Sequence, residues 1–123
     1  AEGLAQIHTH HADASKALPL ADDQVDLCLM ATVLHDLAAD ENHVAALEEI
    51  TRVLNPGGRL AIVEFEKVDG PPGPPRQIRL APAEAEALLT PFGFTAPRLT
   101  PLNPTLYLAQ FQLAAASDER RST

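Results

Sequence analysis

The hydrophobic positions of this chain predict two buried strands with a helix between them. Val25 to Met30 is an almost unbroken apolar run, and a second run extends from Leu60 to Phe65. Runs of this kind are typical of parallel strands that are covered on both faces. Between the two runs, apolar residues recur at helical spacing, which predicts a helix from about Asn42 to Leu54. The positions that carry this spacing are Val44, Leu47, Ile50 and Leu54.

The segment Asn55-Pro56-Gly57-Gly58 is expected to end this helix and to turn the chain into the second strand. Proline cannot continue a helix, and glycine readily adopts the left-handed backbone that follows one. A strand, a helix, a turn and a strand make a βαβ unit with a right-handed crossover. On the polar side of the helix, Glu48 and Arg52 are four positions apart and are expected to pair. The pattern therefore predicts an α/β fold.

Further elements are predicted on either side of a proline-rich connector. Residues 71–75 read Pro-Pro-Gly-Pro-Pro, which fits a stiff surface connector because proline donates no backbone hydrogen bond. Pro82 marks the start of a second helix, and Gly93 is expected to end it. Alternating residues from Thr105 to Leu113 predict a terminal hairpin with Thr95 to Thr100. At the other end of the chain, Ile7 to His11 is a candidate short strand.

Length and composition restrict the class of protein. With 123 residues, 46% of them hydrophobic, the chain is predicted to be a single domain over 1–123, with a frayed tail over 117–123. A net charge of −8 argues against nucleic acid and against anionic membrane surfaces. The single cysteine permits no intrachain disulfide, and no apolar run approaches the roughly 20 residues that span a bilayer. We expect a soluble, cytoplasmic protein.

The sequence His8-Thr9-His10-His11 opens the possibility of a metal site. On a strand, His8 and His10 would share one face, and imidazole with a nearby carboxylate suits zinc. This pattern faintly resembles the openings of amidohydrolases and related phosphoesterases, so a metal-dependent hydrolase is one alternative. The default interpretation is that these histidines lie on a solvated edge strand and that no metal is bound.

Taken in order, several motifs resemble the second half of class I S-adenosylmethionine-dependent methyltransferases of the type 11 group, which includes ubiquinone and menaquinone biosynthesis enzymes. The resemblance covers roughly Ile7 to Leu113. It rests on Ala12-Asp13-Ala14 before Leu18-Pro19-Leu20, on Val25 to Met30 followed by Val33-Leu34-His35-Asp36-Leu37, on Glu49 to Leu60, on Ile78 to Glu84, and on Phe92-Gly93-Phe94.

The resemblance implies a cofactor, S-adenosylmethionine, and roles for individual residues. Asp13 would accept a hydrogen bond from the adenine amino group, and Ala14 would supply a backbone donor to the ring. Met30, Ala31 and Thr32 would form a wall of the cofactor site at the carboxyl end of a strand. The substrate would be a small-molecule methyl acceptor. Such enzymes act mainly by holding the acceptor in line with an activated methyl group.

His35 would then lie near the acceptor pocket and is the candidate catalytic residue. His35-Asp36 is a possible acid/base pair, although neighbours in sequence seldom face each other and Asp36 also fits the start of a loop. Glu64 and Glu66 flank the end of the Leu60 to Phe65 strand, where acceptor pockets form. A solvated strand end explains these two glutamates equally well.

The family's glycine-rich loop after its first strand, and the acidic residue after its second, have no counterpart in this sequence. The resemblance therefore implies a partial Rossmann-like methyltransferase sheet. This sheet would be mostly parallel with an antiparallel C-terminal strand, and it would lack the first two strands. In the family's strand order, 3-2-1-4-5-7-6, the run Val25 to Met30 would become an exposed apolar edge. A homo-oligomer or a partner chain is expected to pair there.

Two main hypotheses follow. The chain is either a methyltransferase-type enzyme that depends on its N-terminal half, or a non-catalytic oligomerisation or binding module derived from one. A metal-dependent hydrolase using His8 and His10 is the third.

Overall fold

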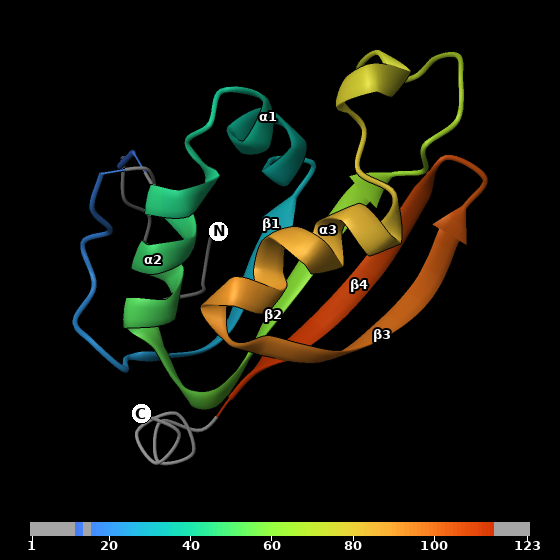
Figure 1. The fold of residues 1–123 in the computed structure, drawn as a ribbon. Helices are drawn as coiled ribbons and strands as arrows, with labels where there is room; N and C mark the ends of the chain where they lie inside the picture. The colour runs from blue at the N-terminus through green and yellow to red at the C-terminus, as the bar shows by residue number, and fades with distance from the viewer. Residues whose placement is uncertain (1–11, 14–15, 115–123) are drawn as a thin grey trace, which may run out of the picture.

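The computed structural model describes residues 12–13 and 16–114, which form an open four-stranded sheet with helices packed against it (Figure 1). The strand order is β1-β2-β4-β3. The strands are β1 (Val25–Ala31), β2 (Leu54–Phe65), β3 (Phe94–Asn103) and β4 (Leu106–Leu113). β1 and β2 are parallel, whereas β4 is antiparallel to both β2 and β3. The predicted α/β class with an antiparallel C-terminal strand is confirmed.

The helices α1 (Leu34–Ala39), α2 (His43–Val53) and α3 (Pro82–Leu89) lie on the same face of the sheet (Figure 1). The side chains that β2 and β4 direct to this face are buried and alternate with more exposed ones. None of the described helices is long and apolar enough to cross a bilayer. The core between sheet and helices contains Leu34, Leu47, Ile50, Leu60, Ile62, Leu89, Phe94, Tyr107, Ala109 and Phe111.

The opposite face of the sheet is not covered by any described helix. On β1, Leu27 is 58% exposed and Leu29 is 62% exposed. β1 is also the terminal strand among the described residues. The expectation that Val25 to Met30 is covered on both faces is therefore wrong for the described part of the chain, whereas the expectation of an exposed apolar edge is confirmed.

The βαβ unit is confirmed, but β2 begins earlier than predicted. α2 ends at Val53, and β2 starts at Leu54 rather than at Leu60. Leu54 pairs with Val25, and the register then shifts so that Arg59 pairs with Leu27. The predicted turn is thus an irregularity inside the strand. It needs glycine at position 58, because a Cβ there would lie 2.8 Å from the carbonyl oxygen of Asn55.

Most of the remaining elements agree with the sequence. α3 is followed by a 3₁₀ turn, Thr90–Phe92, which ends at Gly93 with a left-handed φ of 93°. The terminal hairpin is present as β3 and β4. Residues 71–75 form a connector before a second 3₁₀ turn, Arg76–Ile78. Ile7 to His11 and the tail 117–123 lie outside the described residues. The short helix α1 was not predicted, because six residues give too little periodicity.

The predicted pairing of Arg52 with Glu48 is wrong. Arg52 instead contacts Glu49, with Nη2 2.6 Å from Oε1, and its Nη1 lies 2.8 Å from Asp22 Oδ1. Glu49 also accepts a hydrogen bond from the backbone N–H of Leu18 at 2.7 Å. Spacing alone did not reveal this arrangement, because the partners Leu18 and Asp22 lie in the preceding loop. Glu49 and Arg52 therefore tie that loop to α2.

Replacing Glu49 with glutamine is expected to lower the free energy of unfolding at pH 7 and to have little effect near pH 2. The hydrogen bonds from Arg52 and from the Leu18 backbone lower the pKa of Glu49 from 4.5 to about 2. A depressed carboxyl pKa stabilises the fold above the ordinary pKa, and this stabilisation is lost as the pH falls toward the lowered value. Urea denaturation at several pH values measures the effect. Glu48→Gln is the control, and an equal loss in both variants would contradict the prediction.

Candidate functional site

The carboxyl ends of the parallel strands β1 and β2 meet at one edge of the sheet, which is where open α/β sheets bind ligands. The backbone N–H of Thr32 donates to the carbonyl oxygen of Val63 at 2.7 Å, so the two strand ends stay joined past Ala31. Thr32 then adopts a φ of 53°, which turns the chain toward α1. Of the three predicted wall residues, Met30 is buried in the core, while Ala31 is exposed and Thr32 is partly exposed. Their roles in binding stay predictions.

His35 lies in the first turn of α1 and is only 4% exposed. Its ring Nδ1 lies 2.7 Å from Glu64 Oε2, and its backbone N–H donates to Glu64 Oε1 at 3.0 Å. Glu64 belongs to β2 and is fully buried. One carboxylate thus holds both the ring and the backbone of His35. Asp36 is more distant, with Oδ1 3.4 Å from His35 Nε2 and a largely exposed side chain.

The interpretation of Glu64 as a solvated strand end is wrong. Glu64 follows Leu60 and Ile62 at alternate positions of β2, so its side chain points to the same buried face. This alternation was the signal in the sequence that could have revealed a buried carboxylate. Its partner could not be found in the same way, because His35 lies 29 residues away on another element.

The His35–Glu64 contact determines which ring nitrogen is available for chemistry. Glu64 Oε1 already accepts the backbone N–H of His35, as an ionised carboxylate would. With Oε2 as a second acceptor beside Nδ1, we assign the ring proton to Nδ1, which then donates a hydrogen bond to Glu64. A neutral imidazole in this tautomer has its lone pair on Nε2. His35 can therefore accept a proton at Nε2, and Glu64 stabilises the positive charge that results.

A hollow of about 190 Å³ lies beside His35. It is closed partly by an ion pair in which Lys67 Nζ is 2.8 Å from Glu84 Oε1. The hydrogen bond from Lys67 lowers the pKa of Glu84, as does a further one from the Ala81 backbone. The ring of Phe65 stands edge-on to the His35 ring, with centroids 5.9 Å apart. The residues lining the hollow include His35, Ala38, Lys67, Ile78, Arg79 and Glu84.

Asp13, the predicted adenine contact, is exposed at the start of the described chain. Its carbonyl oxygen accepts the backbone N–H groups of Lys16 at 3.0 Å and Ala17 at 3.2 Å, which forms a turn before Leu18. Ala14, the predicted backbone donor, lies outside the described residues. The roles of Asp13 and Ala14 therefore also stay predictions.

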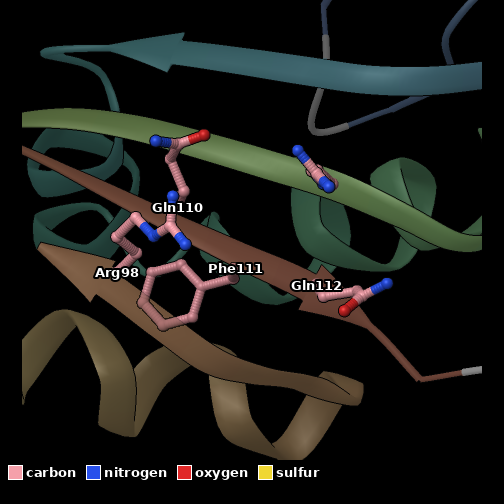
Figure 2. A pocket seen from close by; sticks show the side chains of 5 residues that line it. Arg98, Gln110, Phe111 and Gln112 are labelled. Atoms are coloured by element: carbon pink, nitrogen blue, oxygen red, sulfur yellow. The ribbon is translucent and has the colours of Figure 1, made fainter.

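A second hollow, of about 250 Å³, opens on the sheet face that the described helices leave uncovered (Figure 2). Gln110 and Gln112 come from β4, and Arg98 comes from the neighbouring edge strand β3. Gln112 Nε2 donates to the carbonyl oxygen of Gly57 at 3.3 Å. This hollow has no acid/base pair among its lining residues, so it is a less suitable reaction site than the one beside His35.

The metal hypothesis gains no support from the described residues. Within 12–13 and 16–114, no group of three or more His, Cys, Asp or Glu side chains could hold a metal ion. His8 and His10 lie outside this part of the chain.

Comparison with known proteins gives a consistent result. The family model described as "Methyltransferase domain" matches residues 1–62. The demethylmenaquinone methyltransferase of Mycobacterium sp. (strain KMS) is 43% identical over 53 residues, which is 43% of this chain and 21% of that protein. The ubiquinone/menaquinone biosynthesis C-methyltransferase UbiE of Chromobacterium violaceum is 43% identical over 63 residues, or 51% of this chain and 24% of that protein.

Solved structures extend the similarity beyond the matched sequence. A SAM-dependent methyltransferase from Aquifex aeolicus aligns with a TM-score of 0.79 and 26% identity. The alignment covers 91% of this chain and 57% of that one. The chain thus spans less than a quarter of these two curated relatives and somewhat more than half of the aligned structure.

Proposed function

This chain belongs to the methyltransferase-domain family of class I S-adenosylmethionine-dependent enzymes, and on that premise we propose that it methylates a small molecule beside His35. The observation that carries the proposal is the buried His35–Glu64 pair, with Nδ1 2.7 Å from Oε2. This pair lies where the parallel strands β1 and β2 end. A fully buried carboxylate that holds a histidine at a ligand-binding edge fits a general base.

The residues at the carboxyl end of β1 fit one side of the cofactor. When bound, S-adenosylmethionine supplies an electrophilic methyl group on a sulfonium centre. Ala31 is small and exposed, so the strand end leaves room for a flat ring. Thr32 would adjoin the ring, and the Asp13 carboxylate would accept a hydrogen bond from the adenine amino group. These residues would contact only the adenine end of the cofactor.

His35 and Glu64 would act on the acceptor. An acceptor hydroxyl or nitrogen within hydrogen-bond reach of His35 Nε2 would give its proton to the imidazole as it takes the methyl group that the bound cofactor would supply. The electrons of the broken carbon–sulfur bond would stay on the sulfur, which would leave as a neutral thioether. Glu64, hydrogen-bonded to Nδ1, stabilises the resulting imidazolium, and Asp36, 3.4 Å from Nε2, adds a second negative charge. General-base catalysis of this kind contributes about 10²- to 10⁴-fold in rate.

Titration calorimetry with S-adenosylmethionine tests the function on the chain as it stands. Measurable heat at or below millimolar ligand supports a methyltransferase that binds its own cofactor. No heat even at millimolar ligand would contradict independent methyl transfer and would favour the second candidate, a non-catalytic oligomerisation or binding module. The observation that favours this second candidate is the apolar edge at β1, where Leu27 and Leu29 are each more than half exposed.

We also propose that the β1 edge is where a second copy or a partner chain pairs with this one. Leu27 and Leu29 are both more than half exposed on β1. β1 is also the terminal strand of the described sheet. An apolar strand with unpaired backbone groups is a template for pairing with another strand. A partner along β1 could supply the part of the cofactor site that this sequence lacks.

Replacing Leu29 with lysine is expected to weaken association through β1 by roughly tenfold or more, because burying one leucine contributes about 1.5–3 kcal/mol. Size-exclusion chromatography with light scattering measures the association over a range of concentrations. Val44→Lys is the matched control, since Val44 is 47% exposed on α2, away from β1. A wild-type chain that remains monomeric and takes up no partner would contradict the proposal.

A further inference from the structure

Arg79 is a buried cation at the wall of the hollow beside His35. It is only 2% exposed and follows the 3₁₀ turn Arg76–Ile78. Its guanidinium donates four hydrogen bonds, all to backbone carbonyl oxygens. The acceptors are Glu66 at 3.2 Å, Gly70 at 2.6 Å, Pro72 at 2.8 Å and Pro74 at 2.9 Å.

These four bonds draw the segment 66–74 around a single side chain. Proline-rich chain has few backbone donors with which to hold itself in a closed shape. The carbonyl groups of the segment point inward to Arg79 instead. A planar guanidinium with five fixed donors can span four carbonyl groups, which an ammonium group on a flexible stem cannot do equally well. Arg79 is therefore the centre of this loop.

The closed loop packs against the ring of Phe65. Gly73 has a φ of +103°, and a Cβ at this position would lie 2.6 Å from the Phe65 ring. The guanidinium carbon of Arg79 is 5.3 Å from the centroid of the same ring. Phe65 in turn stands edge-on to the His35 ring, at an interplanar angle of 76°. A continuous series of contacts thus leads from Arg79 through Phe65 to His35.

We infer that Arg79 is a positioning residue for the acceptor site. By closing the segment 66–74 it fixes the Phe65 ring, and this ring limits the orientations of the His35 imidazole beside the hollow. Glu64 holds Nδ1 of that imidazole, whereas Phe65 contacts the ring from the side. The assignment of the hollow to a methyl acceptor rests on the proposed function. The series of contacts from Arg79 through Phe65 to His35 does not depend on the proposed function.

The test replaces Arg79 with glutamine and with lysine in the full chain, with Arg76→Gln as the matched control. Arg76 is exposed in the adjacent turn. Both Arg79 variants are expected to speed tryptic cleavage after Lys67 by roughly tenfold, because the loop opens locally. They are also expected to shift the NMR signals of the His35 ring. In an active preparation, the acceptor KM should rise roughly tenfold, with a smaller change in kcat. Arg76→Gln should leave the cleavage rate, the His35 signals and the acceptor KM unchanged.

Gly73→Ala provides a second variant in case Arg79→Gln does not fold. It keeps the cation but pushes a methyl group against Phe65, so it should also shift the His35 signals. Folded variants with unchanged His35 signals would overturn the inference and leave Arg79 a merely structural residue, even if the loop opens. If the variants shift the His35 signals but the wild-type chain transfers no methyl group, the proposed function is refuted and the link from Arg79 to His35 stands.

Discussion

Replacing His35 with glutamine is expected to lower the rate of methyl transfer by about 10²- to 10⁴-fold, the range for loss of a general base. Glutamine is polar and close in size, so it can keep a hydrogen bond to the buried Glu64 while it cannot accept a proton at neutral pH. The rate is measured in single turnover, with a labelled methyl group on S-adenosylmethionine and a mixture of small hydroxyl and amine acceptors.

His43→Gln is the control for this experiment, because His43 lies at the start of α2 rather than in the His35–Glu64 pair. We expect the control to retain the wild-type rate. A rate for His35→Gln within about twofold of wild type would mean that the acceptor needs no base or that another group provides it. Either result would remove His35 from the mechanism.

Replacing Glu64 with glutamine is expected to lower the rate of methyl transfer nearly as much as His35→Gln does, although the histidine is still present. An amide at position 64 can accept the backbone N–H of His35 through its oxygen and donate to Nδ1 through its nitrogen. The ring would then carry its proton on Nε2 and could no longer accept one there. In serine proteases, the corresponding change of the buried aspartate lowers kcat by about 10⁴-fold through the wrong tautomer.

The tautomer can be read directly from long-range ¹⁵N–¹H NMR correlations of the His35 ring. Wild-type protein should show the proton on Nδ1, and Glu64→Gln should show it on Nε2. Glu66→Gln is the control, since the side chain of Glu66 takes no part in the contacts of His35 described above. An unchanged tautomer together with an unchanged rate would contradict the role given to Glu64.

The sequence predicted the elements whose signals repeat over many residues. α2 was found from apolar residues at helical spacing, although the last of them, Leu54, begins β2. Gly93 has the expected left-handed backbone, but it ends the 3₁₀ turn after α3, whereas α3 itself ends at Leu89. α1 gave no such signal, since it has six residues. The start of β2 was missed because pairing between Leu54 and Val25 depends on two strands at once.

The candidate site was predicted only in part, for a similar reason. His35 was singled out by its family motif, but the only partner considered for it was Asp36, the neighbour in sequence. The structure instead brings Glu64 to the ring across 29 residues. The role of Arg79 was also absent from the sequence pattern. Its partners are backbone carbonyl groups, which every residue carries and no motif records.

The strand order determines when this sheet can form during synthesis on the ribosome. β4 is the last described strand along the chain, yet it lies between β2 and β3 and is the only described neighbour of β3. Among the described strands, only the β1–β2 pair can therefore form before β4 emerges from the exit tunnel. Until then, the face of β2 that carries Leu60 and Ile62 lacks its β4 neighbours Phe111 and Ala109.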